Sequence, residues 1–358
     1  MGQITITPSY VTLSHGAAWS SLGGNEAAAK TVVQQVCDDL KSGLRTNGAD
    51  IGCVVQCGLN AYPLNPSDTA GQAVGAGGSN TFAGAALGDT WTVFRNFLLG
   101  ISSPNTLQQS AWNTTNLPVT APTVDGTQWG FIDYSMALLG MWDPSNVNFT
   151  NNTIVGGAGV NSGAYPDLDQ YGTGAGTNFY EGWFHEITEC IFTRYASAST
   201  SSVMYPWDVF EYSAAGTRTV LSSSTRYLSQ DGGTTNIASM NTGAGDPGDF
   251  AALSGDAFNA SVTSGPVSRS SSVPGQQRDW QALALYLPMS ANGNTWGGMS
   301  TGTGVGSSTG IATVTGIGAA QANAVASSTG QGLVTGVGMG TQTLSVPGIG
   351  MPLRFIGH

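Results

Sequence analysis

The chain has 358 residues and a net charge of −11, and only 9% of its residues are charged. This negative balance excludes a nucleic-acid-binding protein and a protein held by charge on anionic membranes. No apolar run approaches the about 20 residues that cross a membrane, and the N-terminus lacks the basic start and apolar core of a cleavable signal peptide. With 52 glycines and few charges, the composition predicts an extracellular or virion-surface protein rather than a cytosolic enzyme.

Predicted strands and helices alternate in the N-terminal half. Apolar and polar residues alternate over Ile4–Leu13 and again over Asp50–Leu59, which predicts two strands. Between them, Thr31–Arg45 gathers its apolar residues on one face and is predicted to be an amphipathic helix. Trp91–Ile101 is predicted to be a helix, and Gln128–Trp142 a strand followed by a helix.

Two stretches rich in small residues, Gly71–Leu87 and Asn146–Gly176, are predicted to be loops. The second precedes the most informative helix of the chain, so it is expected to wall a cleft. The last apolar segment before the tail lies in Gln276–Pro288 and is predicted to be a helix.

The four cysteines are Cys37, Cys53, Cys57 and Cys190. None forms a CxxC pair, and two of them are too far apart along one predicted strand to bridge each other. Their favoured interpretation is four small buried hydrophobic residues. A disulfide between separate elements stays open as the alternative.

The segment Phe179–Tyr195 is predicted to be a helix capped by Asn178. Its apolar face is formed by Phe184, Ile187, Ile191 and Tyr195. His185 and Glu189 are four residues apart and project from one side, and Glu186 is expected further round on the same solvent-exposed side.

An imidazole and a carboxylate at this spacing, beside a second carboxylate, have the layout of a zinc-protease helix. Here the second ligand is Glu rather than His. In this interpretation His185 and Glu189 bind zinc, and Glu186 is the general base for a metal-bound water. The alternative is a solvated helix face with one histidine. The chain has only three histidines and few acids, yet this helix carries His185 together with Glu181, Glu186 and Glu189. This concentration of rare residues argues against the solvated face.

A third zinc ligand has two main candidates. Asp208 follows a predicted turn that could return to the helix, and Glu211 is the second choice. Tyr195 stands where one protease class places its third ligand, although a core residue is the commoner explanation. His15 is a remote alternative.

Other chemistry is weakly indicated. Asp231, Asp246, Asp249 and Asp256 lie in or near glycine-containing turns and could bind calcium. Asx turns are the commoner explanation. A Ser-His-Asp triad has no nucleophile-elbow pattern around any serine to support it.

The composition changes from about residue 291, where charged side chains almost disappear. A 20-residue repeat follows, since Ser307–Gly318 is echoed by Ser327–Gly338. A flexible linker is one interpretation. The regular Val, Ile and Leu among the glycines favour extended strands packed against neighbouring copies, and so a homo-oligomer assembled through 291–358.

Several motifs occur in a fixed order: His185–Glu189, Tyr205–Gly216, Tyr227–Asn236, Asn241–Thr242, Gly248–Phe250 and Asp256–Asn259. This succession resembles a family of bacterial secreted zinc metalloproteases whose helix reads HEISEVMGR and is followed by segments like PLDLFRYSAPG, SIDGG and DAFNA. The resemblance covers roughly 179–260. It implies Glu189 as the second zinc ligand, Glu186 as the base and Asp208 as the preferred third ligand.

The wider class that the chain resembles is the metzincins, because Ser202–Pro206 looks like their Met-turn around Met204. Besides the missing leader and the missing acidic calcium-binding repeat in the tail, two features at the helix depart from that class. Phe192 stands where a glycine is expected, and the third histidine is absent.

We therefore expect an α+β, metzincin-like domain over 1–290 and a Gly/Thr/Ser-rich repetitive tail over 291–358. The first functional hypothesis is a zinc metallopeptidase that acts on protein or peptide substrates, with calcium as a second metal to consider. The second is a catalytically inactive structural or adhesive component of a phage-like particle.

Overall fold

A computed structural model gives the fold of the chain. It describes residues 2–12, 16–60, 72–74, 87–161, 179–194, 196–197, 199, 201–242, 247–251, 256–258, 277–300, 313–314 and 333–334. The chain divides into two units, Met1–Thr301 and Gly302–His358. Both helices and sheets are present in the first unit, which confirms the α+β class.

The main sheet of the first unit has five strands. Four of them follow the order β1-β3-β9-β4, with the bounds Ile4–Tyr10, Ile51–Asn60, Thr153–Asn161 and Gln72–Val74. β1, β3 and β9 are parallel, β4 is antiparallel to β9, and the short β2 (Gly16–Ala17) pairs antiparallel with β3. The alternating residues Ile51, Cys53, Val55 and Cys57 are all buried, as predicted.

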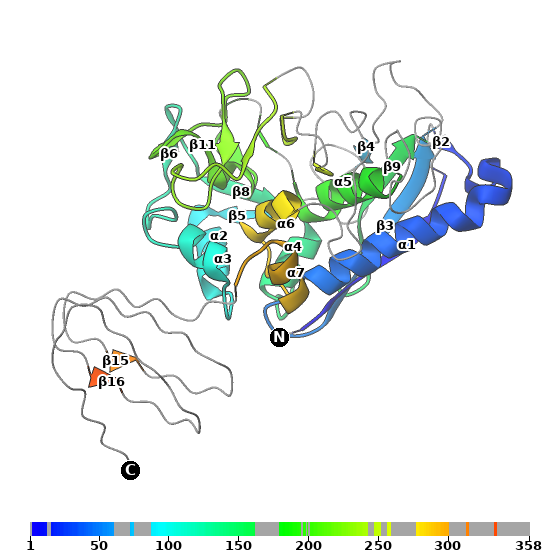
Figure 1. Cartoon of the computed structure of the whole chain (residues 1–358), viewed down its shortest axis with the longest axis horizontal. Coiled ribbons are helices and arrows are strands. Elements are labelled where there is room, and N and C mark those ends of the chain that lie inside the picture. The colour runs from blue at the N-terminus through cyan, green and yellow to red at the C-terminus, as the bar shows by residue number, and fades with distance from the viewer. Residues whose placement is uncertain are drawn as a thin grey trace, which may run out of the picture. The chain divides into compact units, whose positions relative to one another are not determined.

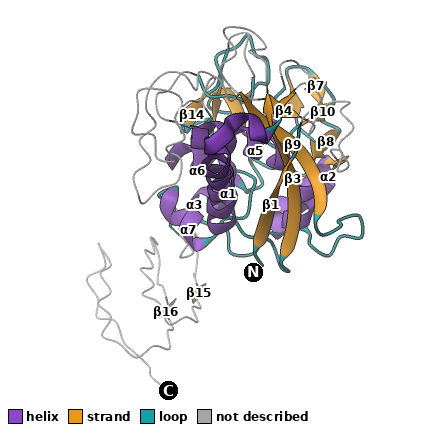
Figure 2. Cartoon of the chain, turned by 90° about the vertical axis from the view of Figure 1, so that its right-hand side faces the viewer, coloured by secondary structure: helices purple, strands orange, loops and turns teal. Residues whose placement is uncertain are grey.

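Two helices cover one face of this sheet and contact each other, α1 (Glu26–Gly43) and α5 (Phe179–Phe192). Figure 2 shows them side by side next to β1, β3 and β9. The predicted apolar face of α1 is buried against β1, through Val32, Val33, Val36, Cys37 and Leu40. In Figure 1, α5 runs through the body of the first unit beside β9 and β4.

The prediction of a loop over Asn146–Gly176 is wrong for its central part, because Thr153–Asn161 forms the interior strand β9. Glycines weaken the strand pattern in the sequence. In the sheet, small residues let α5 approach this strand closely, and Val155 and Ala158 are fully buried. The loop predicted over Gly71–Leu87 likewise contains the edge strand β4, and the rest of its interior lies outside the described residues.

A second, smaller sheet has the strand order β10-β8-β5, with the bounds Val203–Met204, Phe131–Tyr134 and Leu87–Thr90. Two of its strands precede α5 in the chain and one follows it. The helix α2 (Trp91–Gly100) matches its predicted range. β8 leads into α4 (Met136–Trp142), which confirms the predicted strand followed by a helix. Between α2 and β8 lie α3 (Thr106–Ala111), with a capping box on Asn105, and the β6–β7 hairpin (Thr123–Val124 and Thr127–Gln128).

A third sheet follows α5 and has the order β12-β11-β13-β14. Its strands are Thr217–Arg218, Glu211–Ala214, Tyr227–Leu228 and Ala238–Ser239. The described part of the unit also contains two 3₁₀ helices, η1 (Trp19–Asn25) and η2 (Asp208–Phe210). Two α-helices follow among the described residues, α6 (Gln277–Ala284) and α7 (Ala291–Trp296). α6 overlaps the apolar segment 280–287 predicted to be a helix, but it begins and ends three residues earlier.

Three details bear on the sequence predictions. All four cysteines are buried and free, which fits four small hydrophobic residues, and burial raises the pKa of the Cys53 thiol to about 12.

Within the described residues, no helix is long and apolar enough to cross a membrane. In the second unit, β15 (Thr313–Val314) pairs in parallel with β16 (Leu333–Val334), so equivalent positions of the two repeats lie opposite each other.

Candidate metal centre

The helix α5 carries the predicted motif, but it is shorter than predicted and has no exposed side. It ends at Phe192 because Thr193 adopts the left-handed conformation, with φ of 49°. All of its residues are buried, including Glu181, His185, Glu186 and Glu189. The expectation of a solvent-exposed polar side is therefore wrong. The cause is the position of α5 between the main sheet and the segments that carry Phe258 and Trp280, whose rings pack on Phe184.

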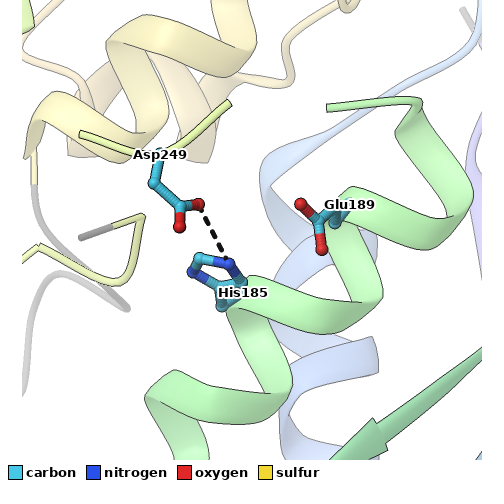
Figure 3. Close-up of side chains that lie close together, drawn as sticks. All are labelled: His185, Glu189 and Asp249. Carbon is cyan, nitrogen blue, oxygen red and sulfur yellow. Dashed lines mark ion pairs between the residues drawn. The ribbon is translucent and has the colours of Figure 1, made fainter. Parts of the chain in front are cut away.

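Three buried side chains come together at this helix: His185, Glu189 and Asp249. One ligand atom from each lies within 4.8 Å of the other two, close enough for a single metal ion to contact all three. Figure 3 shows the two residues of α5 with Asp249, which comes from a separate segment. Imidazole nitrogen and carboxylate oxygen are both among the donor atoms that zinc binds in proteins.

The ring of His185 is held at both nitrogens. Its Nδ1 lies 2.8 Å from the carbonyl oxygen of Ala257, and its Nε2 lies 3.2 Å from Oδ1 of Asp249. The carbonyl can only accept, so Nδ1 carries a proton and Nε2 is the atom that faces the carboxylates. A carbonyl bonded to the outer nitrogen is the usual way in which proteins orient a histidine that binds metal.

Without a metal, the contact between His185 and Asp249 requires a proton on Nε2. Burial and the charge of Arg194 act to lower the pKa of His185. The Asp249 carboxylate, helped by Glu186, outweighs them and raises this pKa above its ordinary value. The site thus attracts a cation, and a metal ion would compete with the proton for Nε2.

The carbonyl that orients His185 is itself fixed by α6. The carboxylate of Asp279 accepts hydrogen bonds from the backbone N–H of Ala257, at 3.0 Å, and of Phe258, at 3.3 Å. Asp279 lies in the first turn of α6, where a carboxylate is favoured by the helix dipole. A residue far along the chain thereby controls the orientation of the imidazole.

Asp249 sits in a segment tied to its neighbours by backbone hydrogen bonds. Its carbonyl accepts from the N–H of Asn241 at 2.8 Å, and the next residue, Phe250, donates to the carbonyl of Phe258 at 2.7 Å. Burial acts to raise the pKa of Asp249, but His185 and Arg194 outweigh it and lower this pKa. The carboxylate is therefore ionised, as a metal ligand must be.

Arg194 supplies a positive charge beside the cluster. Its guanidinium lies 3.3 Å from Oδ1 of Asp249 and 3.8 Å from Oε1 of Glu189. It also donates to the carbonyl of Gly248 at 3.0 Å, and its Cζ lies 4.4 Å from the ring centre of Phe258. The side chain is fully buried, so this charge offsets part of the negative charge of the two carboxylates.

The structure brings Asp249, and not Asp208, to His185 and Glu189. Asp208 serves local turns instead, since its carboxylate accepts from the N–H and the hydroxyl of Ser197, at 2.7 and 2.8 Å, and from the N–H of Tyr205 at 2.8 Å. Glu211, the second choice, pairs with Arg226 at 2.8 Å. Tyr195 and His15, the other candidate ligands, lie outside the described residues.

The calcium interpretation involves four acids, of which Asp246 lies outside the described residues. Asp231 makes the turn expected as the alternative, because its carboxylate accepts from Ser229 and Thr235. Asp256 pairs with Arg278 at 2.9 Å. Asp249 belongs to the cluster with His185.

The structure also describes the predicted general base, Glu186, and Met204 of the predicted Met-turn. Glu186 is buried on α5, next to His185. Met204 is also fully buried, and its sulfur lies 3.4 Å from the hydroxyl of Ser197, which also bonds Asp208. The predicted Met-turn is therefore linked to the turn around Asp208.

The sequence places Asp249 among several acids near glycines and within the motif Gly248–Phe250, but gives it no role in the zinc site. Nothing local to it indicates a partner on α5, because the contact joins distant parts of the chain. The one usable signal is the motif Gly248–Phe250 within the ordered set of motifs. In comparisons with known proteins, no protein-family description, curated protein or solved structure matches this chain.

Proposed function

We propose that the first unit is a zinc-dependent hydrolase of the metallopeptidase type, with a metzincin-like arrangement, that cleaves peptide bonds. The observation that carries this proposal is the orientation of His185. Its Nδ1 is bonded to the carbonyl of Ala257, and its Nε2 is directed at Asp249 within a buried group that includes Glu189. We assign His185, Glu189 and Asp249 as the metal ligands, with Asp249 in the place first expected for Asp208.

A zinc ion held by these residues would supply the Lewis acidity that polarises a water molecule and the peptide carbonyl. Glu186 takes the proton of the attacking water and delivers it to the leaving amine. With two anionic ligands, a zinc ion held here would be a weaker Lewis acid than one held by histidines alone. Arg194 partly compensates for this, because its buried guanidinium lies beside both carboxylates.

Metal analysis of the full-length protein, purified without chelators, tests this proposal. We expect about one zinc per chain. A chelator should remove the zinc together with hydrolysis of an unfolded protein substrate, and added zinc should restore both. A protein without zinc that also fails to bind added zinc would contradict the proposal.

A second candidate function is favoured by two observations, the burial of the site and the presence of Arg194. His185 and Glu189 are 4% exposed and Asp249 is 6% exposed. A buried arginine beside two carboxylates is also found in purely structural ion-pair networks. These features support a catalytically inactive structural or adhesive component, in the extracellular or virion setting that the composition favours. A peptide-library digest separates the two functions, because only the first predicts defined cleavage products that disappear in Glu186→Gln.

The tail supports an assembly role in either case. The repeat places Thr313 opposite Leu333 in parallel strands. We propose that strands of this kind join copies of the chain into a homo-oligomer. Light scattering of the intact protein should then give a mass of several chains, and a monomer would exclude this role.

A further inference from the structure

The two residues before Asp249 are both held by buried arginines. The carbonyl of Pro247 accepts from Nη2 of Arg226 at 2.6 Å, and the carbonyl of Gly248 accepts from Nη1 of Arg194 at 3.0 Å. Both arginine side chains are fully buried. Two consecutive peptide groups are therefore fixed immediately before the side chain that completes the candidate metal centre.

The two arginines reach this segment from different elements. Arg194 follows the end of α5, whereas Arg226 directly precedes β13. Arg226 is fixed on its own side by Nε, which lies 2.8 Å from Oε2 of Glu211 on β11, and by its carbonyl, which accepts from the N–H of Met240 at 2.8 Å. The segment is thus tied to the ligand helix and to the third sheet at once.

Core packing alone does not explain Arg226. A buried ion pair is often no more stabilising than apolar side chains of the same volume, because both charges lose their hydration. What an apolar side chain cannot supply is a forked donor that holds a carboxylate with one nitrogen and a carbonyl with another. The guanidinium of Arg226 reaches both groups, since its Nε lies at ion-pair distance from Glu211 and its Nη2 donates to the carbonyl of Pro247.

We infer that Arg226 is a positioning residue of the metal centre: together with Arg194 it clamps Pro247 and Gly248, so that the carboxylate of Asp249 is held at the distance from His185 that a shared metal needs. This inference rests on the proposed metal centre and extends it to a residue outside the ligand group. Because Arg226 acts only through the backbone of its neighbour segment, its loss should weaken metal binding while the ligands themselves remain.

Cobalt(II) titration of the full-length protein, followed by its visible absorption, tests this inference. Glu211→Gln is the matched control, since it removes the carboxylate but keeps the bond from Arg226 to Pro247. The double variant Glu211→Gln/Arg226→Met differs from it only at the arginine. We expect the control to bind Co²⁺ within about twofold of the wild type, and the double variant to bind at least about tenfold more weakly with an altered spectrum, as for other residues that orient ligands.

Equal Co²⁺ affinity of the control and the double variant would overturn the inference and leave the metal centre intact. A wild type that binds neither Co²⁺ nor zinc would instead overturn the proposed function, and this inference with it. If the double variant does not fold, Arg226→Lys replaces it, because a single ammonium group keeps the charge beside Glu211 without the fork that reaches Pro247. We then expect at least about fivefold weaker Co²⁺ binding, and an unchanged affinity would contradict the clamp.

Discussion

The carboxylate of Asp249 lies 3.2 Å from Nε2 of His185. This contact joins the ligand helix to the segment that follows β14, and it places two groups together that can both act as acceptors. Only a proton or a metal ion between them makes the contact favourable, since Nδ1 of His185 already donates to Ala257. The proposed metal ion and a proton would therefore compete for the same position between His185 and Asp249.

The roles of Asp249 and Asp208 can be separated by two matched substitutions. Asp249→Asn should weaken zinc binding by more than about 100-fold, because it removes an anionic ligand, whose loss should cost more than that of a residue outside the ligand group. Asp208→Asn should leave one zinc per chain, because its carboxylate bonds only Ser197 and Tyr205 among the described residues. Zinc affinity, measured by competition with a chromophoric chelator, checks both. The reverse result would restore Asp208 as the third ligand.

Removal of the base should separate catalysis from metal binding. Glu186→Gln keeps the shape of the side chain but cannot accept the proton of water. We expect peptidase activity to fall by about 10²–10⁴-fold while the zinc content stays at the wild-type level. Activity on an unfolded protein substrate and metal analysis of the same sample provide the measurement. Full activity in this variant would remove Glu186 from the mechanism.

The raised pKa of the buried Asp208 carboxyl group predicts that the stability of the protein depends on pH. Burial, which outweighs the bonds from Tyr205 and Ser197, raises its pKa from 3.8 to about 6. The folded protein then binds the proton more tightly than the unfolded chain, so this stabilisation is complete below about pH 4 and is lost as the pH rises to about 6. The free energy of unfolding should fall by up to about 3 kcal/mol across this window.

Urea denaturation at a series of pH values measures this effect. The comparison is between the wild type and Asp208→Asn, which cannot titrate at this position. The slope between about pH 4 and 6 should be smaller in the variant. An identical slope in both proteins would show that Asp208 ionises in the folded protein at its ordinary pKa.

The extent of the first unit can be tested by truncation. The helix α7 lies beyond residue 290 but packs on the core, where Trp296 and Trp280 have ring centres 4.9 Å apart and Ser290 donates to the carbonyl of Gly43 at 3.0 Å. A chain that ends at residue 290 loses the aromatic contact and leaves part of the core open. We expect a cost of at least about 3 kcal/mol.

A chain that ends at residue 301 is the control, because it keeps α7 and coincides with the boundary between the two units. Its thermal midpoint should match that of the intact chain within about 2 °C. Equal stability of the two shortened chains would instead place the boundary at 290, as the change in composition suggests.

Regular patterns made part of the fold predictable. The range of α2 and the buried face of β3 follow from the spacing of their apolar residues. The strand β9 was missed because its glycines carry no alternation, although its neighbours give it an interior place. Similarly, the shared side of His185 and Glu189 on α5 could be predicted from their i and i+4 spacing, whereas the approach of Asp249 depends on a contact between distant segments.

The burial of all of α5 also affects the rate at which its backbone amide hydrogens exchange with solvent deuterium. The amide protons around His185 and Glu189 are covered by the main sheet on one side and by aromatic rings on the other. No small local opening would release them, so deuterium should replace them only when the whole unit unfolds. The exchange rate of these amides should then report the free energy of global unfolding, and a bound metal ion should slow it further.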